Sequence, residues 1–113
     1  LNNTVTAYDL MLIYEKMANG EIVDRQSSLA MIDILSNQQF NTIIPARLPT
    51  DVKVAHKTGS IAGVLHDSGI IFLPDGRKYV LVLLARELKD TEGAREAMAN
   101  VSEMIYQYMS DRN

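Results

Sequence analysis

Lys57, Thr58 and Gly59 place a cation, a hydroxyl and a bare backbone position side by side in a stretch that otherwise has the apolar character of a strand. A lysine without a partner is costly in an apolar interior, so Lys57 is expected to face water, a carboxylate or an anionic ligand. The Thr58 hydroxyl can donate to the same anion, and Gly59 lets another backbone or a ligand approach closely. If the stretch is an edge strand, its free N–H groups can bind a substrate or a developing oxyanion. The residues predict a binding rim for a carboxylate-bearing acyl substrate; the alternative is a solvated edge strand with an ordinary lysine.

Three strands are expected to surround this stretch and to form an antiparallel meander. They span residues 52–60, 65–73 and 78–85, with turns at 61–64 and at 74–77, where proline and glycine supply the required backbone angles. Because side chains alternate along a strand, Lys57, Gly59 and Ile61 share one face, and His56, Thr58 and Ser60 share the other.

Helices are expected on both sides of the strands in the sequence. The first begins at a Thr6–Asp9 capping box and ends at Gly20, and the second begins at Asp24. The last begins at Asp90 or Thr91. The expected buried stripes are Leu10, Ile13, Tyr14 and Met17; Leu29, Met31, Ile32 and Leu35; and Ala94, Ala97, Met98, Val101, Ile105 and Tyr108. Met98, Met104 and Met109 are expected to fill the core, whereas Arg47, Arg95, Glu96 and Glu103 are expected at the surface.

The chain resembles the penicillin-recognising serine hydrolases, namely the class A β-lactamases and penicillin-binding proteins. Lys57-Thr58-Gly59 matches the third motif of that family, Lys-Thr-Gly. The resemblance extends over nearly the whole chain, in order and in spacing. It includes the segments at residues 3–10, 42–49, 66–74 and 79–84. The implied architecture is α+β, part of a β-lactamase-like fold: a three-stranded antiparallel sheet (51–113, with the last helix packed on it) and two N-terminal helices (1–50).

The other two motifs of the family are missing. No Ser-x-x-Lys occurs, and Ser110-Asp111-Arg112-Asn113 only imitates the second motif, Ser-Asp-Asn. In the family both motifs precede Lys-Thr-Gly. The chain therefore resembles the C-terminal half of such an enzyme, and it is expected to need the missing N-terminal half, with its serine nucleophile, as its partner.

The resemblance implies a role for each residue of the motif. Lys57 would lie near the nucleophile and attract the substrate carboxylate, Thr58 would hydrogen-bond that carboxylate, and Gly59 would leave room for the helix that bears the nucleophile. The backbone N–H of Ser60 would be one of two oxyanion-hole donors, so Lys57 and Ser60 are the expected catalytic residues. Ile61, where the family commonly has glycine, would narrow the mouth of the cleft.

Two further departures concern the second strand. Many class A enzymes carry an arginine near the position of Leu65, which puts one contact to the substrate carboxylate in doubt. His66 replaces a more usual polar residue before Asp67, and His66 and Asp67 are interpreted as a structural, hydrogen-bonded pair rather than a catalytic one.

The third strand suggests a second function. Val80–Leu84 is apolar on both faces, as in a central strand, yet it is the last strand of the chain and has a free edge. The partner at that edge could be the missing half or a second copy of the chain, which would make this an assembly module. A third possibility is a degenerate member that binds peptidoglycan-like ligands without turnover.

Composition narrows these possibilities. The 113 residues are one domain at most, and 47% are hydrophobic. A net charge of −3 gives no reason to expect nucleic acid, and cysteine is absent. Two histidines do not form a metal site, so no cofactor is expected. The family resemblance implies a secreted, periplasmic or cell-surface bacterial location.

Overall fold

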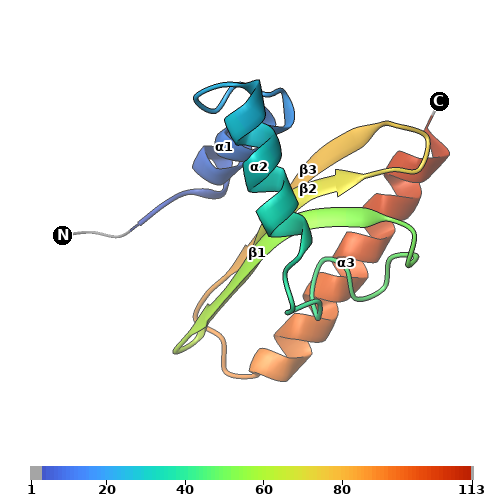
Figure 1. The fold of residues 1–113 in the computed structure, drawn as a ribbon. Coiled ribbons are helices and arrows are strands. Elements are labelled where there is room, and N and C mark those ends of the chain that lie inside the picture. Colours follow the sequence, from blue (N-terminus) through green and yellow to red (C-terminus); the bar gives the residue numbers. More distant parts are fainter. Residues whose placement is uncertain (1–3, 113) are drawn as a thin grey trace.

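The computed structural model describes residues 4–112, which form two layers of helices around one sheet. The elements are α1 (Ala7–Ala18), α2 (Arg25–Ser36), β1 (Lys53–Ile61), β2 (Val64–Phe72), β3 (Lys78–Ala85) and α3 (Thr91–Asp111). The sheet is antiparallel with the order β1-β2-β3. Figure 1 shows α1 and α2 on one face of the sheet and α3 across the other. The predicted α+β architecture is confirmed. Among residues 4–112, no helix is long and apolar enough to cross a membrane.

The strand boundaries follow the prediction closely. The third strand has the predicted limits, whereas β1 and β2 are each displaced by one residue, because Ile61 pairs with Val64 and extends the ladder to a two-residue turn. Gly63 in that turn has a φ of +76°, and Gly76 in the β2–β3 turn has a φ of +94°. Glycine adopts these left-handed angles without a steric penalty.

Each helix begins at a side chain that caps its first N–H groups. Thr6 and Asp9 form the predicted capping box, with Asp9 N–H donating to Thr6 Oγ1 at 3.0 Å. Asp24 Oδ1 accepts from the Ser27 N–H at 2.7 Å at the start of α2. Asp90 caps α3. These local contacts fix where the helices start, and thereby which side chains reach the sheet.

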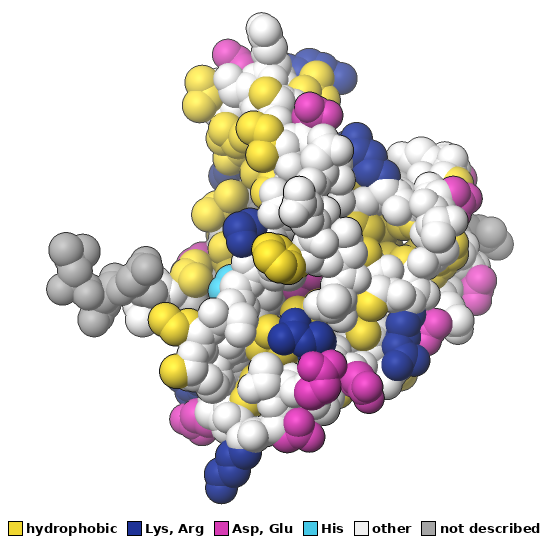
Figure 2. Space-filling model, turned by 60° about the horizontal axis from the view of Figure 1, so that its bottom comes forward, with side chains coloured by type: hydrophobic (Ala, Val, Ile, Leu, Met, Phe, Trp, Pro, Cys, Tyr) yellow, Lys and Arg dark blue, Asp and Glu magenta, His cyan; other side chains and the backbone are white. Residues whose placement is uncertain are grey.

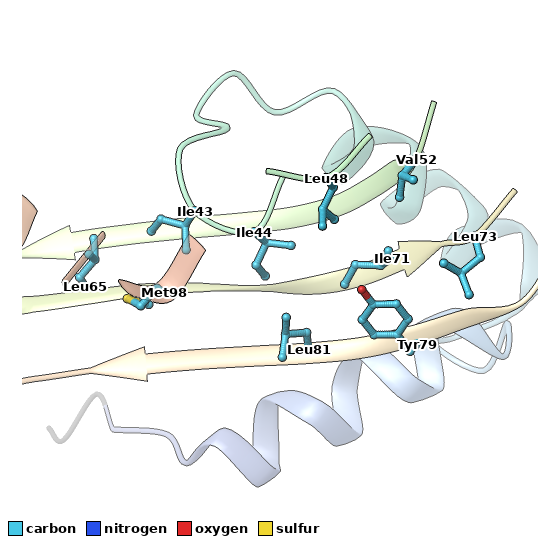
Figure 3. Packing of buried hydrophobic residues seen from close by; sticks show 10 residues of the cluster. All are labelled: Ile43, Ile44, Leu48, Val52, Leu65, Ile71, Leu73, Tyr79, Leu81 and Met98. Atoms are coloured by element: carbon cyan, nitrogen blue, oxygen red, sulfur yellow. The ribbon is translucent and has the colours of Figure 1, made fainter. Parts of the chain in front are cut away.

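The larger core cluster lies between the sheet, α3 and the connector that spans residues 37–52. Ile43 and Ile44 from the connector are fully buried there, against Leu65 and Ile71 of β2. The Ser102 hydroxyl of α3 donates to the carbonyl of Ile44 at 2.9 Å. Figure 3 shows the ten buried residues: Ile43, Ile44, Leu48, Val52, Leu65, Ile71, Leu73, Tyr79, Leu81 and Met98.

A smaller core cluster joins α1 and α2 to the opposite face of the sheet. Tyr14, Met17 and Ile32 bury their side chains against Ala55 of β1 and Ile70 of β2. Ser68 of β2 also donates to the Tyr14 phenol oxygen at 3.1 Å. Burial raises the pKa of Tyr14, so its hydroxyl remains protonated in the core.

Part of the predicted buried stripe of α3 is wrong. Ala97, Val101 and Tyr108 are exposed, and Met104 is 69% exposed rather than part of the core. The buried line instead passes through Met98 and Ser102, because the Ser102 hydroxyl has an acceptor inside the core and is satisfied there.

Two residues of the helices on the other face were also assigned wrongly. Ile13 of α1 and Leu29 of α2 were predicted to be buried, but both are about half exposed. Each helix packs on the sheet through a narrower stripe than its apolar residues span, so its outer apolar residues remain uncovered over residues 4–112.

The β2–β3 hairpin holds the end of α3 through Arg77. Its Nη1 donates to the carbonyls of Met109 at 2.9 Å and Arg112 at 2.7 Å, and its Nη2 donates to that of Ser110 at 3.2 Å. A cation at the C-terminus of a helix satisfies carbonyls that lack helical partners and complements the helix dipole. The hairpin therefore fixes where α3 ends.

Candidate substrate-binding site

Lys57, Thr58, Gly59 and Ser60 lie on an edge strand. β1 pairs with β2 on one side, and no other strand of residues 4–112 pairs with it on the other. Lys57 is exposed, and its Nζ donates to the Thr58 carbonyl at 2.6 Å. The predicted edge position of this stretch is confirmed.

The backbone of β1 presents polar groups at this free edge. Along an antiparallel strand, successive residues direct their N–H and C=O groups alternately toward the partner strand and away from it. The pair Ile61–Val64 encloses a two-residue turn, which makes it a hydrogen-bonded pair, so Ser60 and Thr58 direct their backbone groups outward. The Thr58 carbonyl that accepts from Lys57 fits this assignment. The N–H of Ser60 is thus available to an outside acceptor.

A cavity of 360 Å³ adjoins this edge. In the view of Figure 2, basic side chains lie on both sides of a hollow near the middle of the face. The cavity brings together the connector, β1, β2 and α3, and its lining residues are Phe40, Thr42, Lys57, Thr58, Gly59, Ser60, Leu65 and Arg95.

Three residues of this cavity were not predicted from the sequence, namely Phe40, Thr42 and Arg95, and Arg95 is the charged one. It was predicted on a solvated face of α3, but its side chain is only 28% exposed and lies in the cavity with Lys57 and Thr58. Its Nη1 donates to Thr42 Oγ1 at 3.3 Å, and its Nε lies 3.6 Å from Glu92 Oε2. The signal in the sequence was its spacing from Met98, which lies three residues later on the predicted buried stripe of α3. The cavity thus contains two cations, and Leu65 forms part of the wall between the strands and α3.

The buried histidine–aspartate pair differs from the predicted one. Asp67 does not pair with its neighbour His66; its Oδ1 lies 2.8 Å from Nδ1 of His56, and its Oδ2 accepts from the Ile44 N–H at 2.9 Å. Adjacent residues of a strand point to opposite faces, so Asp67 faces α3 and His66 faces the α1–α2 side. The prediction that Asp67 is hydrogen-bonded is confirmed, but the predicted pair with His66 is wrong, because the partner of Asp67 comes from the neighbouring strand.

Comparison with known proteins identifies the family. The sequence profile described as "Beta-lactamase enzyme family" matches residues 1–109. The chain belongs to the beta-lactamase enzyme family. A curated beta-lactamase of Bacteroides uniformis is 34% identical over 70 residues, which cover 55% of this chain and 24% of the relative.

Solved structures of this family share the fold. The structure of PBP-A is 34% identical, with a TM-score of 0.82, and the match covers 92% of this chain and 39% of PBP-A. A class A beta-lactamase from Bacteroides cellulosilyticus is 21% identical, with a TM-score of 0.86, and the match covers 93% of this chain and 41% of that enzyme. The beta-lactamase-family chain described here therefore spans about a quarter of the curated relative and two fifths of these structures.

Two other residues of this beta-lactamase-family chain occupy places that the sequence did not indicate. A Cβ at Gly59 would overlap the imidazole of His66, so it is this ring that lies over the glycine. The Nδ1 of His66 is buried without a hydrogen-bond partner among the described residues. Ile61 is 74% exposed and lies outside the 360 Å³ cavity, so the structure does not bring it together with the other predicted site residues.

Proposed function

We propose that the chain is the C-terminal part of a serine hydrolase of the β-lactamase type, which acts on β-lactams or on amides that resemble D-Ala-D-Ala. The observation that supports this most directly is the cavity at the free edge of β1. Two cations, Lys57 and Arg95, line it together with the Thr58 hydroxyl and the outward N–H of Ser60. Such a set suits a substrate that carries an anion beside a reactive carbonyl.

The proposed reaction is acyl transfer through a covalent serine ester. The serine oxygen, supplied by the rest of the protein, attacks the amide carbonyl; a C–O bond forms, the C–N bond breaks, and the departing nitrogen takes up a proton. Water then cleaves the ester and releases the serine and a carboxylic acid. One solved relative, a mutant of PBP-A, is described as an acyl-enzyme complex with penicillin G, which supports this chemistry.

Each residue of the β1 edge receives a distinct role in this reaction. Lys57 attracts the substrate carboxylate near the nucleophile, and Thr58 donates a hydrogen bond to that carboxylate. The Ser60 N–H stabilises the oxyanion, a contact whose loss typically costs about 3–4 kcal/mol in the transition state. Gly59 keeps this part of the strand free of a side chain.

Arg95 is proposed to hold the anionic end of the substrate from the α3 side. In the family an arginine near the position of Leu65 is common, and here Leu65 and Arg95 line the same cavity. We expect Arg95→Ala to weaken binding of a penicillin with a free carboxylate by about 10- to 150-fold, the value of a charged hydrogen bond of about 1.5–3 kcal/mol. The methyl ester of the same penicillin lacks the charge, and its binding should change much less. Equal losses for acid and ester would contradict this role.

The overall proposal is tested with full-length protein and a fluorescent penicillin. Denaturing electrophoresis and intact mass should show one covalent adduct, and the rate of its formation should fall in Thr58→Val and Lys57→Ala. Arg47→Ala is the matched control, because Arg47 is an exposed arginine of the connector that does not line the cavity. Absence of any adduct on the unmodified protein would refute the proposal.

The same experiment separates turnover from mere binding. An enzyme releases the hydrolysed penicillin and returns to its free mass, whereas a degenerate penicillin-binding module keeps the adduct or forms none. A secreted, periplasmic or cell-surface location, suggested by the family, belongs to this proposal, because penicillins and peptidoglycan-like substrates are met there.

The second candidate function is assembly through β3, which forms the other edge of the sheet in the described part of the chain. Leu84 is exposed on this apolar strand, and Val80 and Val82 are partly exposed. We propose that the missing N-terminal half covers this edge, and that without it two copies pair there. Light scattering of residues 1–113 should show a dimer or larger species, and addition of the N-terminal half should dissociate it. A stable monomer of residues 1–113 would exclude pairing between copies.

A further inference from the structure

His56 is a buried residue that joins the buried Asp67 to the exposed Asn41 by hydrogen bonds, next to the cavity-lining residue Lys57. It precedes Lys57 in β1, is 1% exposed, and points toward the α3 side of the sheet. Its Nδ1 lies 2.8 Å from Asp67 Oδ1, and its Nε2 lies 3.0 Å from Asn41 Oδ1. The ring thus links β1 to β2 and to the connector.

Both partners of the ring are hydrogen-bond acceptors. Asp67 is fully buried, and its second oxygen is already engaged by the Ile44 N–H at 2.9 Å, as expected for a carboxylate. The Asn41 amide nitrogen donates to the Gln38 carbonyl at 3.2 Å, which turns the amide oxygen toward His56. A neutral imidazole has one N–H and can satisfy only one acceptor, whereas an imidazolium has two. The network is complete only when both ring nitrogens carry protons.

The charges around the ring are consistent with a cation. Asp67 contributes a carboxylate from β2, and the connector contributes the neutral amide of Asn41. From α3, Ser102 donates to the carbonyl of Ile44 and Arg95 donates to Thr42, so neither is hydrogen-bonded to the ring itself. Lys57 follows His56 in β1 but points to the opposite face of the sheet. A buried cation in contact with a buried carboxylate, with further hydrogen bonds on both, meets the conditions under which such a pair is tolerated.

We propose that His56 is a buried imidazolium that acts as a positioning residue for Lys57, Thr58 and Ser60. β1 is an edge strand with a backbone ladder on one side only, so side-chain anchors decide how its free edge lies against the cavity. His56 precedes Lys57, and Asp67 is paired with Thr58 in the ladder. Loss of the second ring proton leaves Asn41 Oδ1 facing an acceptor, which separates the connector from β1 beside the cavity. The effect on turnover rests on the proposed function; the charge of the ring does not.

The first test determines the protonation state of the two ring nitrogens of His56. Full-length protein labelled with ¹⁵N-histidine is studied by NMR, and the His56 signals are assigned by their loss in His56→Gln. Two protonated ring nitrogens are expected at neutral pH. A ring with one unprotonated nitrogen at neutral pH would overturn the proposal, since it would mean that Asn41 is turned and donates to the ring.

The second test separates positioning from mere stability. The rate of acylation by the fluorescent penicillin is measured against pH for folded protein. His56→Gln should slow acylation about tenfold or more, since a misplacement of about 1 Å can cost on the order of 100-fold. The unmodified protein should lose rate as pH rises through the His56 titration seen by NMR, and this limb should be absent in His56→Gln. Ser110→Ala, at the exposed end of α3, is the control and should match the unmodified protein.

The proposed function and the proposed role of His56 can be refuted independently. If the unmodified protein is not acylated while NMR shows an imidazolium, the proposed function is wrong and the charge assignment stands. If the protein is acylated and the alkaline limb persists unchanged in His56→Gln, the positioning role is wrong.

Discussion

Gly69→Ala should destabilise the protein strongly, because β1 leaves no room for a Cβ at Gly69 of β2. Gly69 is paired with His56 in the ladder. A Cβ built on Gly69 would lie 2.7 Å from the Cβ and 2.8 Å from the Cα of His56, and it would overlap the carbonyl oxygen of Ala55. All three atoms belong to the backbone or to the base of a side chain, so no rotamer change relieves the contact. One strand has to move.

The expected cost follows from two contributions. Overpacking a buried site typically costs about 1–3 kcal/mol. Moving β1 also stretches the 2.8 Å contact between His56 and Asp67, and a hydrogen bond to a charged group contributes about 1.5–3 kcal/mol. The free energy of unfolding should therefore fall by about 2.5–6 kcal/mol.

Chemical denaturation of the full-length protein, followed by circular dichroism, measures this change. Gly76→Ala is the matched control, because a Cβ at Gly76 meets nothing within 4 Å and only the φ of +94° opposes it. That control should cost about 1–2 kcal/mol. If Gly69→Ala costs no more than Gly76→Ala, the close packing of β2 against His56 described above is incorrect.

Three further predictions concern single side chains. Ser102→Ala should lower the free energy of unfolding by about 1–3 kcal/mol, because it leaves the buried Ile44 carbonyl without its donor; thermal denaturation checks this. Tyr79→Phe should leave stability unchanged or raise it, because the Tyr79 hydroxyl is buried without a partner among the described residues. Burial raises the pKa of Tyr79 to about 12, so its contribution to stability should decline as pH rises from about 10 to about 12, and the decline should be absent in Tyr79→Phe. Hydrogen bonds from Ser27 lower the pKa of Asp24 in the folded protein. The stability that this cap provides is therefore present at pH values above the unfolded-state pKa of Asp24, and it is lost as pH falls through the folded-state pKa. Asparagine also caps helices but does not titrate, so Asp24→Asn should abolish this acid dependence when denaturation is measured against pH.

The sequence was sufficient for features that depend on neighbours in the chain. The capping residues Thr6, Asp24 and Asp90 and the turn at Gly76 were predicted because each acts within a few residues of itself. The edge position of Lys57 was also predictable, since a lysine does not fit a dry central strand.

Features that depend on contacts across the fold were predicted less well. The inward turn of α3 at Ser102 depends on the Ile44 carbonyl, 58 residues away in the chain. Likewise, Asp67 is hydrogen-bonded to His56 rather than to the adjacent His66, because only the side chain of His56 lies on the same face of the sheet as Asp67. Arg95 was placed at the surface because its charge outweighed its spacing, and only the arrangement of α3 beside β1 shows that it lines the cavity.

The hydrogen bonds from Arg77 to the last turn of α3 affect where an affinity tag is best placed. Its guanidinium occupies the carbonyls of Met109, Ser110 and Arg112, so the polypeptide leaves the fold beside the β2–β3 hairpin, as the C label in Figure 1 shows. An acidic affinity tag joined directly at this point would compete for the guanidinium and loosen the helix. A short neutral spacer, or a tag at the other terminus, avoids that competition.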